Sequence, residues 1–401
     1  MNIIFFTDTD ISPYIGGIER VTINLAKQLG TKGHQCFLGY FKECVTEPAQ
    51  HCFQNKFKIE PKNISQQLNR LLITNNIQTC VINIASKKIL CYFNKILYDV
   101  SRELNIKVIY GFYNIPGFEL NGINCSLGTY RLLHGNINSN TINGIIAHFF
   151  KKLHFDGLLK RKIAQKLKWG LYADEIVLLS ERYIPLYLNY IGNHSQVKFR
   201  AIGNPLSYSE NIDLSKIKNK EKMVVQVARC DDFFKRQTTA LRIWKEIESS
   251  HKYDDWKFVM VGYGQDENYI KRTAERLQLH NFEFQGRQNP RELLTKASVY
   301  LMTSAFEGLP MIVLDAQQFG VVPIAYNSFA SIYDIIENGH NGLIIPNDQT
   351  GEYVRKLMWL MDHSAEREAM AVRGLESCRR FSNEKIVRAW ERAVEPLQKN
   401  I

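Results

Sequence analysis

Residues 299–320, VYLMTSAFEGLPMIVLDAQQFG, carry the most informative local pattern in this chain. The first residues of the stretch are apolar or β-branched and loop residues follow them, which predicts a buried strand. Pro310 suits the first turn of a helix, where its missing N–H costs nothing, and Gly320 suits the helix end. Glu307 is therefore expected in a tight strand-to-helix loop, and Asp315 about a turn and a half inside the helix.

This loop has the chemistry of an anion site. The free N–H groups and the positive dipole end of a helix attract phosphate. Two carboxylates beside such a helix end, Glu307 and Asp315, suit a ligand that carries hydroxyls as well as a diphosphate. A nucleotide sugar is such a ligand. The plainer alternative is an ordinary strand–helix unit with solvated acids.

The same stretch resembles the Glu-x7-Glu motif of the family 4 retaining glycosyltransferases. The resemblance implies the GT-B fold, in which two Rossmann-like, doubly wound domains face each other across a cleft and a C-terminal helix crosses back. The usual form is close to E-G-F/L-P-x-x-x-L-E-A-x-x-x-G, and one position departs from it, because Asp315 stands where the family has Glu. The residues that match are Glu307, Gly308, Pro310, Leu314, Ala316 and Gly320.

The length and patterning of the chain agree with two domains. At 401 residues the chain exceeds one typical core, and apolar runs alternate with helical patterns, as in parallel α/β sheets. We predict an N-terminal acceptor-side domain (1–206), a C-terminal nucleotide-sugar-binding domain (207–382) and a final helix (383–401) that packs back on the first. The expected strands are 3–7, 35–41, 79–85, 106–111, 174–180, 197–202, 223–227, 256–261, 299–303, 321–325 and 341–346.

Composition restricts the possible partners and location. The chain has no run of about 18 apolar residues, and its first residues read as a strand rather than a signal peptide. We therefore expect a cytoplasmic protein. The net charge of +11 favours an anionic partner, although no nucleic-acid fold signature is visible. The cysteines show no metal spacing and are expected to be thiols; they are Cys36, Cys44, Cys52, Cys80, Cys91, Cys125, Cys230 and Cys378.

Several loops of the second half are expected to bind the donor. Arg229 and Lys235 follow a predicted strand, where ligands bind in open α/β sheets, so they are placed to clamp a diphosphate and stabilise the leaving nucleotide. Gly262 allows a nucleotide to approach closely. By resemblance, the backbone near Arg287 reads the base, and Leu309 lies in the loop that holds the phosphate.

The first half offers weaker signals. Gly16 and Gly17 precede a helix, and by resemblance this loop approaches phosphates. Asp8-Thr9-Asp10 looks like the D-x-D metal motif of another glycosyltransferase class, but no further ligand cluster accompanies it, so no metal is predicted. The family often has a His near the donor sugar. Here either His134 takes that role or Tyr113 stands in its place.

Residues 148–170 form a basic amphipathic pattern, which is typical of a helix at a membrane surface. The alternative is a solvated basic face on an ordinary domain helix. The basic residues expected at a membrane or acceptor face include Lys151, Lys152, Lys160, Arg161 and Lys162. This pattern favours peripheral attachment at the inner face of the cell membrane.

The combined interpretation is a metal-independent, retaining glycosyltransferase without a cofactor. Its donor is expected to be a UDP-sugar that supplies a hexose or N-acetylhexosamine. Its acceptor is expected to be a glycan or lipid-linked glycan in surface polysaccharide or lipopolysaccharide synthesis. The alternatives are a catalytically silent, sugar-nucleotide-binding partner protein of GT-B fold and a GT-B nucleotide-sugar epimerase.

Overall fold

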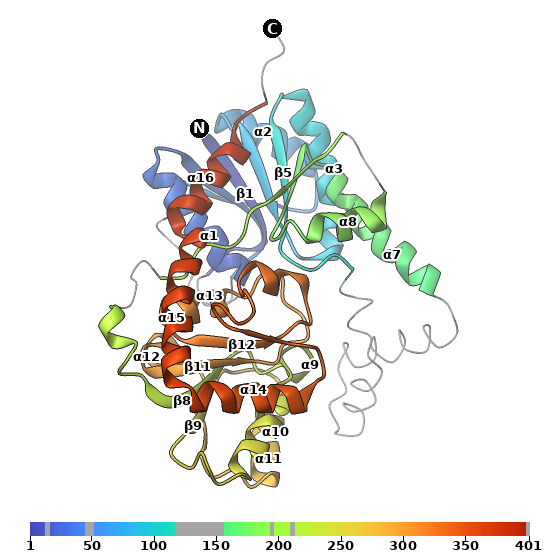
Figure 1. The fold of residues 1–401 in the computed structure, drawn as a ribbon. Coiled ribbons are helices and arrows are strands. Elements are labelled where there is room, and N and C mark those ends of the chain that lie inside the picture. Colours follow the sequence, from blue (N-terminus) through green and yellow to red (C-terminus); the bar gives the residue numbers. More distant parts are fainter. Residues whose placement is uncertain (13–16, 45–51, 118–155, 193–195, 209–212, 398–401) are drawn as a thin grey trace. The chain divides into compact units, whose positions relative to one another are not determined.

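The computed structural model describes residues 1–12, 17–44, 52–117, 156–192, 196–208 and 213–397 (Figure 1). The chain divides into two compact units. The first contains residues up to Pro205 together with the segment that begins at Asn383, and the second contains Leu206–Ser382. The second unit is thus continuous in sequence, whereas the first is built from both ends of the chain.

The first unit is built on a parallel sheet of seven strands within the described residues, in the order β3-β2-β1-β4-β5-β6-β7. The strands are β1 (Asn2–Thr9), β2 (Gln35–Lys42), β3 (Lys56–Lys58), β4 (Thr79–Asn83), β5 (Lys107–Phe112), β6 (Glu175–Leu178) and β7 (Lys198–Ala201). The helices are α1 (Gly17–Thr31), α2 (Ile64–Thr74), α3 (Lys87–Glu103), α7 (Asp156–Lys168), α8 (Tyr183–Ile191) and α16 (Asn383–Val394). Ile3–Phe6 at the sheet centre is fully buried, as a strand covered on both faces requires.

The second unit is built on a parallel sheet of six strands within the described residues, in the order β10-β9-β8-β11-β12-β13. The strands are β8 (Glu221–Val227), β9 (Lys257–Val261), β10 (Phe282–Phe284), β11 (Ala297–Met302), β12 (Val322–Tyr326) and β13 (Leu343–Ile345). The helices are α9 (Asp232–Lys235), α10 (Gln237–Glu248), α11 (Glu267–Arg276), α12 (Arg291–Lys296), α13 (Met311–Gln318), α14 (Thr350–Asp362) and α15 (Ser364–Cys378).

The prediction of two doubly wound α/β units with parallel sheets is confirmed. In the second unit the order of strands reverses between β8 and β11, and the loops that follow these neighbouring strands carry Arg229 and Glu307. Ligands of open α/β sheets bind beyond the carboxyl ends of the strands at such a point. The short strands β3 and β10 were not predicted, because three residues are too few to show an alternation.

Helix α16 packs within the first unit, far from its neighbours in sequence. Asn24 Nδ2 donates to Asn383 Oδ1 over 2.9 Å at the start of the helix. At the other end, Thr79 Oγ1 donates to the Val394 carbonyl over 2.7 Å, and the Lys107 ammonium donates to the Ala393 carbonyl. These side chains satisfy carbonyls that a helix end leaves without partners. No helix among the described residues is long and apolar enough to cross a membrane.

Candidate functional site

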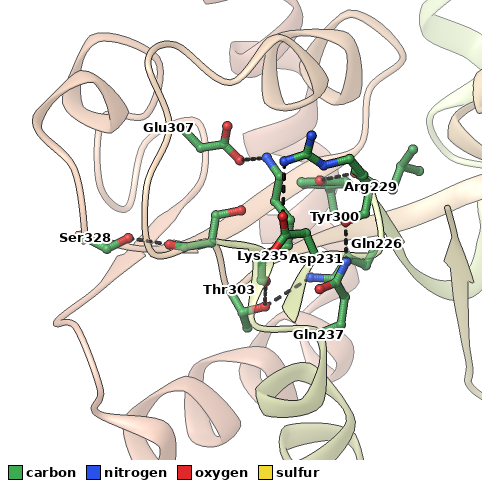
Figure 2. Close-up of polar contacts among 11 residues, drawn as sticks. Gln226, Arg229, Asp231, Lys235, Gln237, Tyr300, Thr303, Glu307 and Ser328 are labelled. Carbon is green, nitrogen blue, oxygen red and sulfur yellow. Dashed lines mark hydrogen bonds and ion pairs between the residues drawn. The ribbon is translucent and has the colours of Figure 1, made fainter. Parts of the chain in front are cut away.

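The loops that follow β8 and β11 are bound to each other in the second unit (Figure 2). Thr303, which comes directly after β11, is fully buried, and its Oγ1 lies 2.9 Å from the Lys235 carbonyl. The same Oγ1 accepts a hydrogen bond of 3.0 Å from Gln226 Nε2 on β8. The Ala305 N–H donates to the Phe234 carbonyl over 2.8 Å. The loop after β11 is therefore held against the end of α9.

An ion pair joins these two loops. The Lys235 ammonium donates to Glu307 Oε1, and the side chains are 20% and 16% exposed. Figure 2 shows both groups pointing toward each other, Lys235 from the end of α9 and Glu307 from the loop after β11. Lys235 was predicted in a loop, but it is the last residue of the short helix α9. The structure thus brings the predicted cation and the predicted acid into direct contact.

Tyr300 on β11 is near enough to Glu307 and Asp315, the two predicted acids, for their charges to affect the pKa of its hydroxyl. Its hydroxyl donates to the Val227 carbonyl over 3.1 Å. Burial raises the pKa of this hydroxyl, and the charges of Glu307 and Asp315 raise it further. The two carboxylates therefore act electrostatically on the same small region at the end of β11.

Arg229 lies at the carboxyl end of β8 with its head largely in solvent. Its side chain is 63% exposed, and a guanidinium nitrogen lies 3.2 Å from Asp231 Oδ2. The Gln237 amide donates to the Arg229 carbonyl over 2.7 Å, which fixes the backbone of the loop. This arrangement gives an exposed cation on a fixed backbone, as an anion clamp needs.

Helix α13 begins one residue later than predicted. Pro310 is its N-cap residue rather than its first helical residue, and it makes no hydrogen bond as a side-chain cap. Gly308 is half-buried, whereas Leu309 and Pro310 are buried. The first N–H groups of α13 thus receive no side-chain acceptor from the residue that usually supplies one.

Asp315 is 4% exposed and makes contacts that the sequence did not suggest. Ser207 Oγ donates to Asp315 Oδ2 over 3.0 Å, and the Ser207 N–H donates to Asp315 Oδ1 over 3.3 Å. The two residues are 108 positions apart, so no local pattern points to this pair.

The loops after β9 and β10 complete this edge of the sheet. The Gly262 N–H donates to the Gly286 carbonyl over 2.8 Å. A Cβ on Gly262 would lie 1.9 Å from the Ala228 carbonyl oxygen, so only glycine fits there. The Arg287 guanidinium lies over the Tyr263 ring, 4.5 Å from its centroid, and this ring is 42% exposed. Tyr263 was not predicted, although its position between two glycines after a strand marked the loop.

The candidates of the first unit are only partly described. Gly16, His134, Lys151 and Lys152 lie outside the described residues, and Gly17 begins α1. A Cβ on Gly17 would meet nothing within 4 Å.

The first unit also contains Tyr113 and the motif Asp8-Thr9-Asp10, two features noted in the sequence. Tyr113 follows β5, and burial raises the pKa of its hydroxyl. In the motif Asp8-Thr9-Asp10, the Asp8 carboxylate accepts the Ala85 N–H over 2.8 Å, and Asp10 pairs with Lys56 over 2.9 Å.

Helix α7 presents a basic surface. Lys160, Arg161 and Lys162 are exposed, whereas Ile163 and Leu167 are buried in the first unit. The buried pair shows that part of the apolar side of this helix packs inward, while these three basic residues face the solvent.

Comparison with known proteins finds a family model that matches most of the second unit. Residues 208–376 match the family model of the glycosyl transferases group 1. The chain is 26% identical over 221 residues to an uncharacterized glycosyltransferase of Haemophilus influenzae, a match that covers 55% of this chain and 60% of the relative. It is 24% identical over 194 residues to a GalNAc-alpha-(1->4)-GalNAc-alpha-(1->3)-diNAcBac-PP-undecaprenol alpha-1,4-N-acetyl-D-galactosaminyltransferase of Campylobacter jejuni, which covers 48% of this chain and 53% of that enzyme. The chain thus matches somewhat more than half the length of these relatives.

Solved structures match over nearly the whole chain. Anabaena HepE in complex with UDP has a TM-score of 0.70 at 15% identity, with 98% of this chain and 99% of HepE covered. TarM of S. aureus has a TM-score of 0.73 at 11% identity, with 98% and 99% covered. At this identity the likeness establishes the fold. The chain therefore has the GT-B fold, and residues 208–376 of its second unit match the model of the glycosyl transferases group 1 family.

Proposed function

We propose that this protein is a retaining glycosyltransferase that uses a UDP-sugar as donor. It transfers a hexose or N-acetylhexosamine to a hydroxyl of a glycan or lipid-linked glycan, in surface polysaccharide or lipopolysaccharide synthesis. The observation that carries the proposal is the ion pair between Lys235 and Glu307 at the carboxyl edge of the second sheet. The names of the relatives support the substrate classes, because the Campylobacter jejuni enzyme acts on an undecaprenol-linked glycan and HepE was crystallised with UDP-glucose.

Two cations and a helix end bind the diphosphate in this proposal. Arg229 is exposed and can turn toward a ligand, whereas Lys235 is already held beside Glu307. The first N–H groups of α13 add a positive dipole end. Together they stabilise the negative charge that develops on the departing nucleotide, so that bond cleavage needs no metal ion.

Glu307 and Asp315 bind the two sugars of the donor, which are the transferred sugar and the ribose of the nucleotide. Glu307 hydrogen-bonds hydroxyls of the transferred sugar, and its contact with Lys235 keeps it oriented. Asp315 takes the ribose hydroxyls. The backbone at Gly262 and Arg287 approaches the base, and the exposed Tyr263 ring lies on the same pair of loops. Retention of configuration follows from the resemblance, with the leaving phosphate taking the acceptor proton.

Peripheral membrane contact is a separate part of the proposal. The exposed Lys160, Arg161 and Lys162 of α7 would attract an anionic lipid surface electrostatically. Vesicle sedimentation tests this. Binding to anionic vesicles should fall when all three residues are changed to Gln, and neutral vesicles should bind neither protein. Equal binding of both proteins to anionic vesicles would contradict the role of α7.

The test of the reaction combines binding and turnover. Thermal shift with UDP and a panel of UDP-sugars should stabilise the wild type, because a ligand at 100 times its Kd adds about 2.7 kcal/mol. Glu307→Gln should bind UDP with little change, since the diphosphate is held by the cations. It should lose sugar transfer by about 100-fold, because the donor sugar is no longer aligned.

Glu275→Gln, an exposed acid on α11, is the matched control and should behave like the wild type. The donor site would be refuted if no nucleotide or nucleotide sugar shifts the thermal midpoint. Donor binding without transfer or hydrolysis in the wild type would instead identify a catalytically silent binding protein.

A further inference from the structure

The Asp315 carboxylate is held from a part of the chain that the proposed reaction does not yet use. Asp315 lies on α13 and is 4% exposed. Ser207 supplies two hydrogen bonds to it, one to each oxygen, from its hydroxyl and from its backbone N–H. Because Ser207 binds both oxygens, it fixes the plane of the carboxylate and thereby the directions in which its lone pairs point.

Ser207 belongs to a linker segment (Leu206–Tyr208) that is itself fixed. The Leu206 N–H donates to the Phe381 carbonyl over 3.0 Å. Gln318 Nε2 donates to the Tyr208 carbonyl over 2.8 Å, and the Tyr208 ring packs edge-on against Phe319, with 5.0 Å between ring centroids. The linker segment thus runs along the C-terminal half of α13 and is anchored on both sides of Ser207.

The linker segment is also the point at which the chain enters the second unit, because the first unit ends at Pro205. A serine in this segment can orient an acid of the donor site without contacting the donor. The shorter side chain of Asp315, compared with the Glu of the resembled motif, makes this support more important, since fewer rotatable bonds leave fewer ways to reach a ligand.

We propose that Ser207 is a positioning residue, which holds the Asp315 carboxylate in the orientation that receives a ribose hydroxyl of the nucleotide. This proposal rests on the proposed function and deepens it. The linker segment then becomes part of the donor site, and nucleotide selectivity for ribose depends on it. Ser207 is exposed, so that removal of its hydroxyl is not expected to unfold the protein.

The test compares UDP with 2′-deoxy-UDP and 3′-deoxy-UDP on the full chain by isothermal titration calorimetry. The wild type should prefer UDP over at least one deoxynucleotide by about tenfold, as expected for a hydrogen bond to a charged group. Ser207→Ala should reduce this preference to about twofold or threefold and should leave the affinity for that deoxynucleotide nearly unchanged. If Ser207 had only a structural role, Ser207→Ala would instead lower the affinity for all nucleotides by a similar factor.

A double-mutant cycle sharpens the test. Asp315→Asn should abolish the preference for UDP, and adding Ser207→Ala to it should change nothing further, because the two residues act as one group. Ser249→Ala is the matched control, since this exposed serine in the same unit also donates one side-chain hydrogen bond, to the Lys245 carbonyl over 2.8 Å.

The outcomes separate the two proposals. If Ser207→Ala keeps the full preference for UDP, or loses affinity for all nucleotides by the same factor, the proposed role of Ser207 is wrong. The proposal of nucleotide binding would remain valid in either case. Equal wild-type affinity for UDP and both deoxynucleotides would overturn the role of Ser207 as well, because Asp315 would then not contact ribose. Absence of any nucleotide binding would overturn the proposed function itself.

Discussion

Lys220 shows how one half-buried lysine joins several elements of the second unit. Its ammonium donates to the carbonyls of Leu294, Thr295 and Phe319 over 2.7, 2.8 and 2.7 Å. These carbonyls lie at the C-terminal ends of α12 and α13, where helices leave acceptors without partners. Burial lowers the pKa of Lys220 to about 7. The residue was not singled out from the sequence, because a lysine in a polar segment reads as exposed.

We expect the stability of the second unit to rise with pH through this group. The folded pKa lies below that of an ordinary lysine, so the unfolded chain binds more protons than the folded chain above about pH 7. The stability should therefore rise from about pH 7 to about pH 10, with a slope of at most about 1.4 kcal/mol per pH unit. Lys220→Met removes this titration.

Urea unfolding of both proteins across this pH range measures the effect. The difference in free energy of unfolding, wild type minus Lys220→Met, should grow as the pH rises. A difference that stays constant would show that Lys220 remains fully charged in the folded state.

Two glycines of the predicted site should respond differently to substitution by alanine. Gly262→Ala places a Cβ 1.9 Å from the Ala228 carbonyl oxygen, so two loops must move apart. We expect a loss of about 1–3 kcal/mol of stability. Gly17→Ala meets nothing within 4 Å and lies at the start of α1, so its stability should be unchanged or slightly higher. Thermal denaturation of both variants tests this, and equal effects would contradict it.

Helix α16 is anchored by a buried charge cluster in the first sheet. Glu175 on β6 is 1% exposed, and it pairs with Lys107 on β5 over 3.2 Å and with Arg200 on β7. Lys107 also donates to the Ala393 carbonyl at the end of α16. The cluster therefore joins three strands and one helix that are remote in sequence.

Lys107→Ala should destabilise the first unit by about 2 kcal/mol or more, because it leaves the buried Glu175 with one partner fewer and the Ala393 carbonyl without its Lys107 donor. Arg388→Ala on α16 is the control. Arg388 and Glu384 form an exposed pair, each 65% exposed, and such pairs contribute little. Chemical denaturation should show a larger loss of stability for Lys107→Ala than for Arg388→Ala. Similar losses would show that the buried cluster contributes no more to stability than an exposed ion pair.

The strands and helices themselves were largely predictable. Continuous apolar runs predicted the buried strands of both sheets, and the Pro310 and Gly320 positions bounded α13 within one or two residues. Element boundaries and short pieces were less predictable, as β3 and the short helix α9 show. Brief segments of three or four residues depend on their neighbours in space more than on their own composition.

The chain as a whole consists of one continuous and one discontinuous unit, and this should be visible in unfolding. Ile386 and Trp390 of α16 are buried in the first unit. A protein truncated after Ser382 loses this helix, so the transition of the first unit should move to lower temperature. The transition of the second unit, Leu206–Ser382, should stay where it was.

Calorimetry of the truncated protein tests this, with UDP added to identify the second transition through its stabilisation. Trp390→Ala in the full chain is a smaller change than the truncation. It should lower only the transition temperature of the first unit. A uniform fall of both transitions in either protein would contradict the division into units.

Local patterns in the sequence sufficed for the α/β class, the parallel strands and the loop with Glu307, because periodicity, Pro and Gly act over a few residues. They did not predict which loops meet. The Lys235–Glu307 pair spans 72 positions and the Ser207–Asp315 pair spans 108. These contacts depend on the order of strands in the sheet and on the path of the linker segment. That order is set by packing between distant parts of the chain, which no short stretch of sequence encodes by itself.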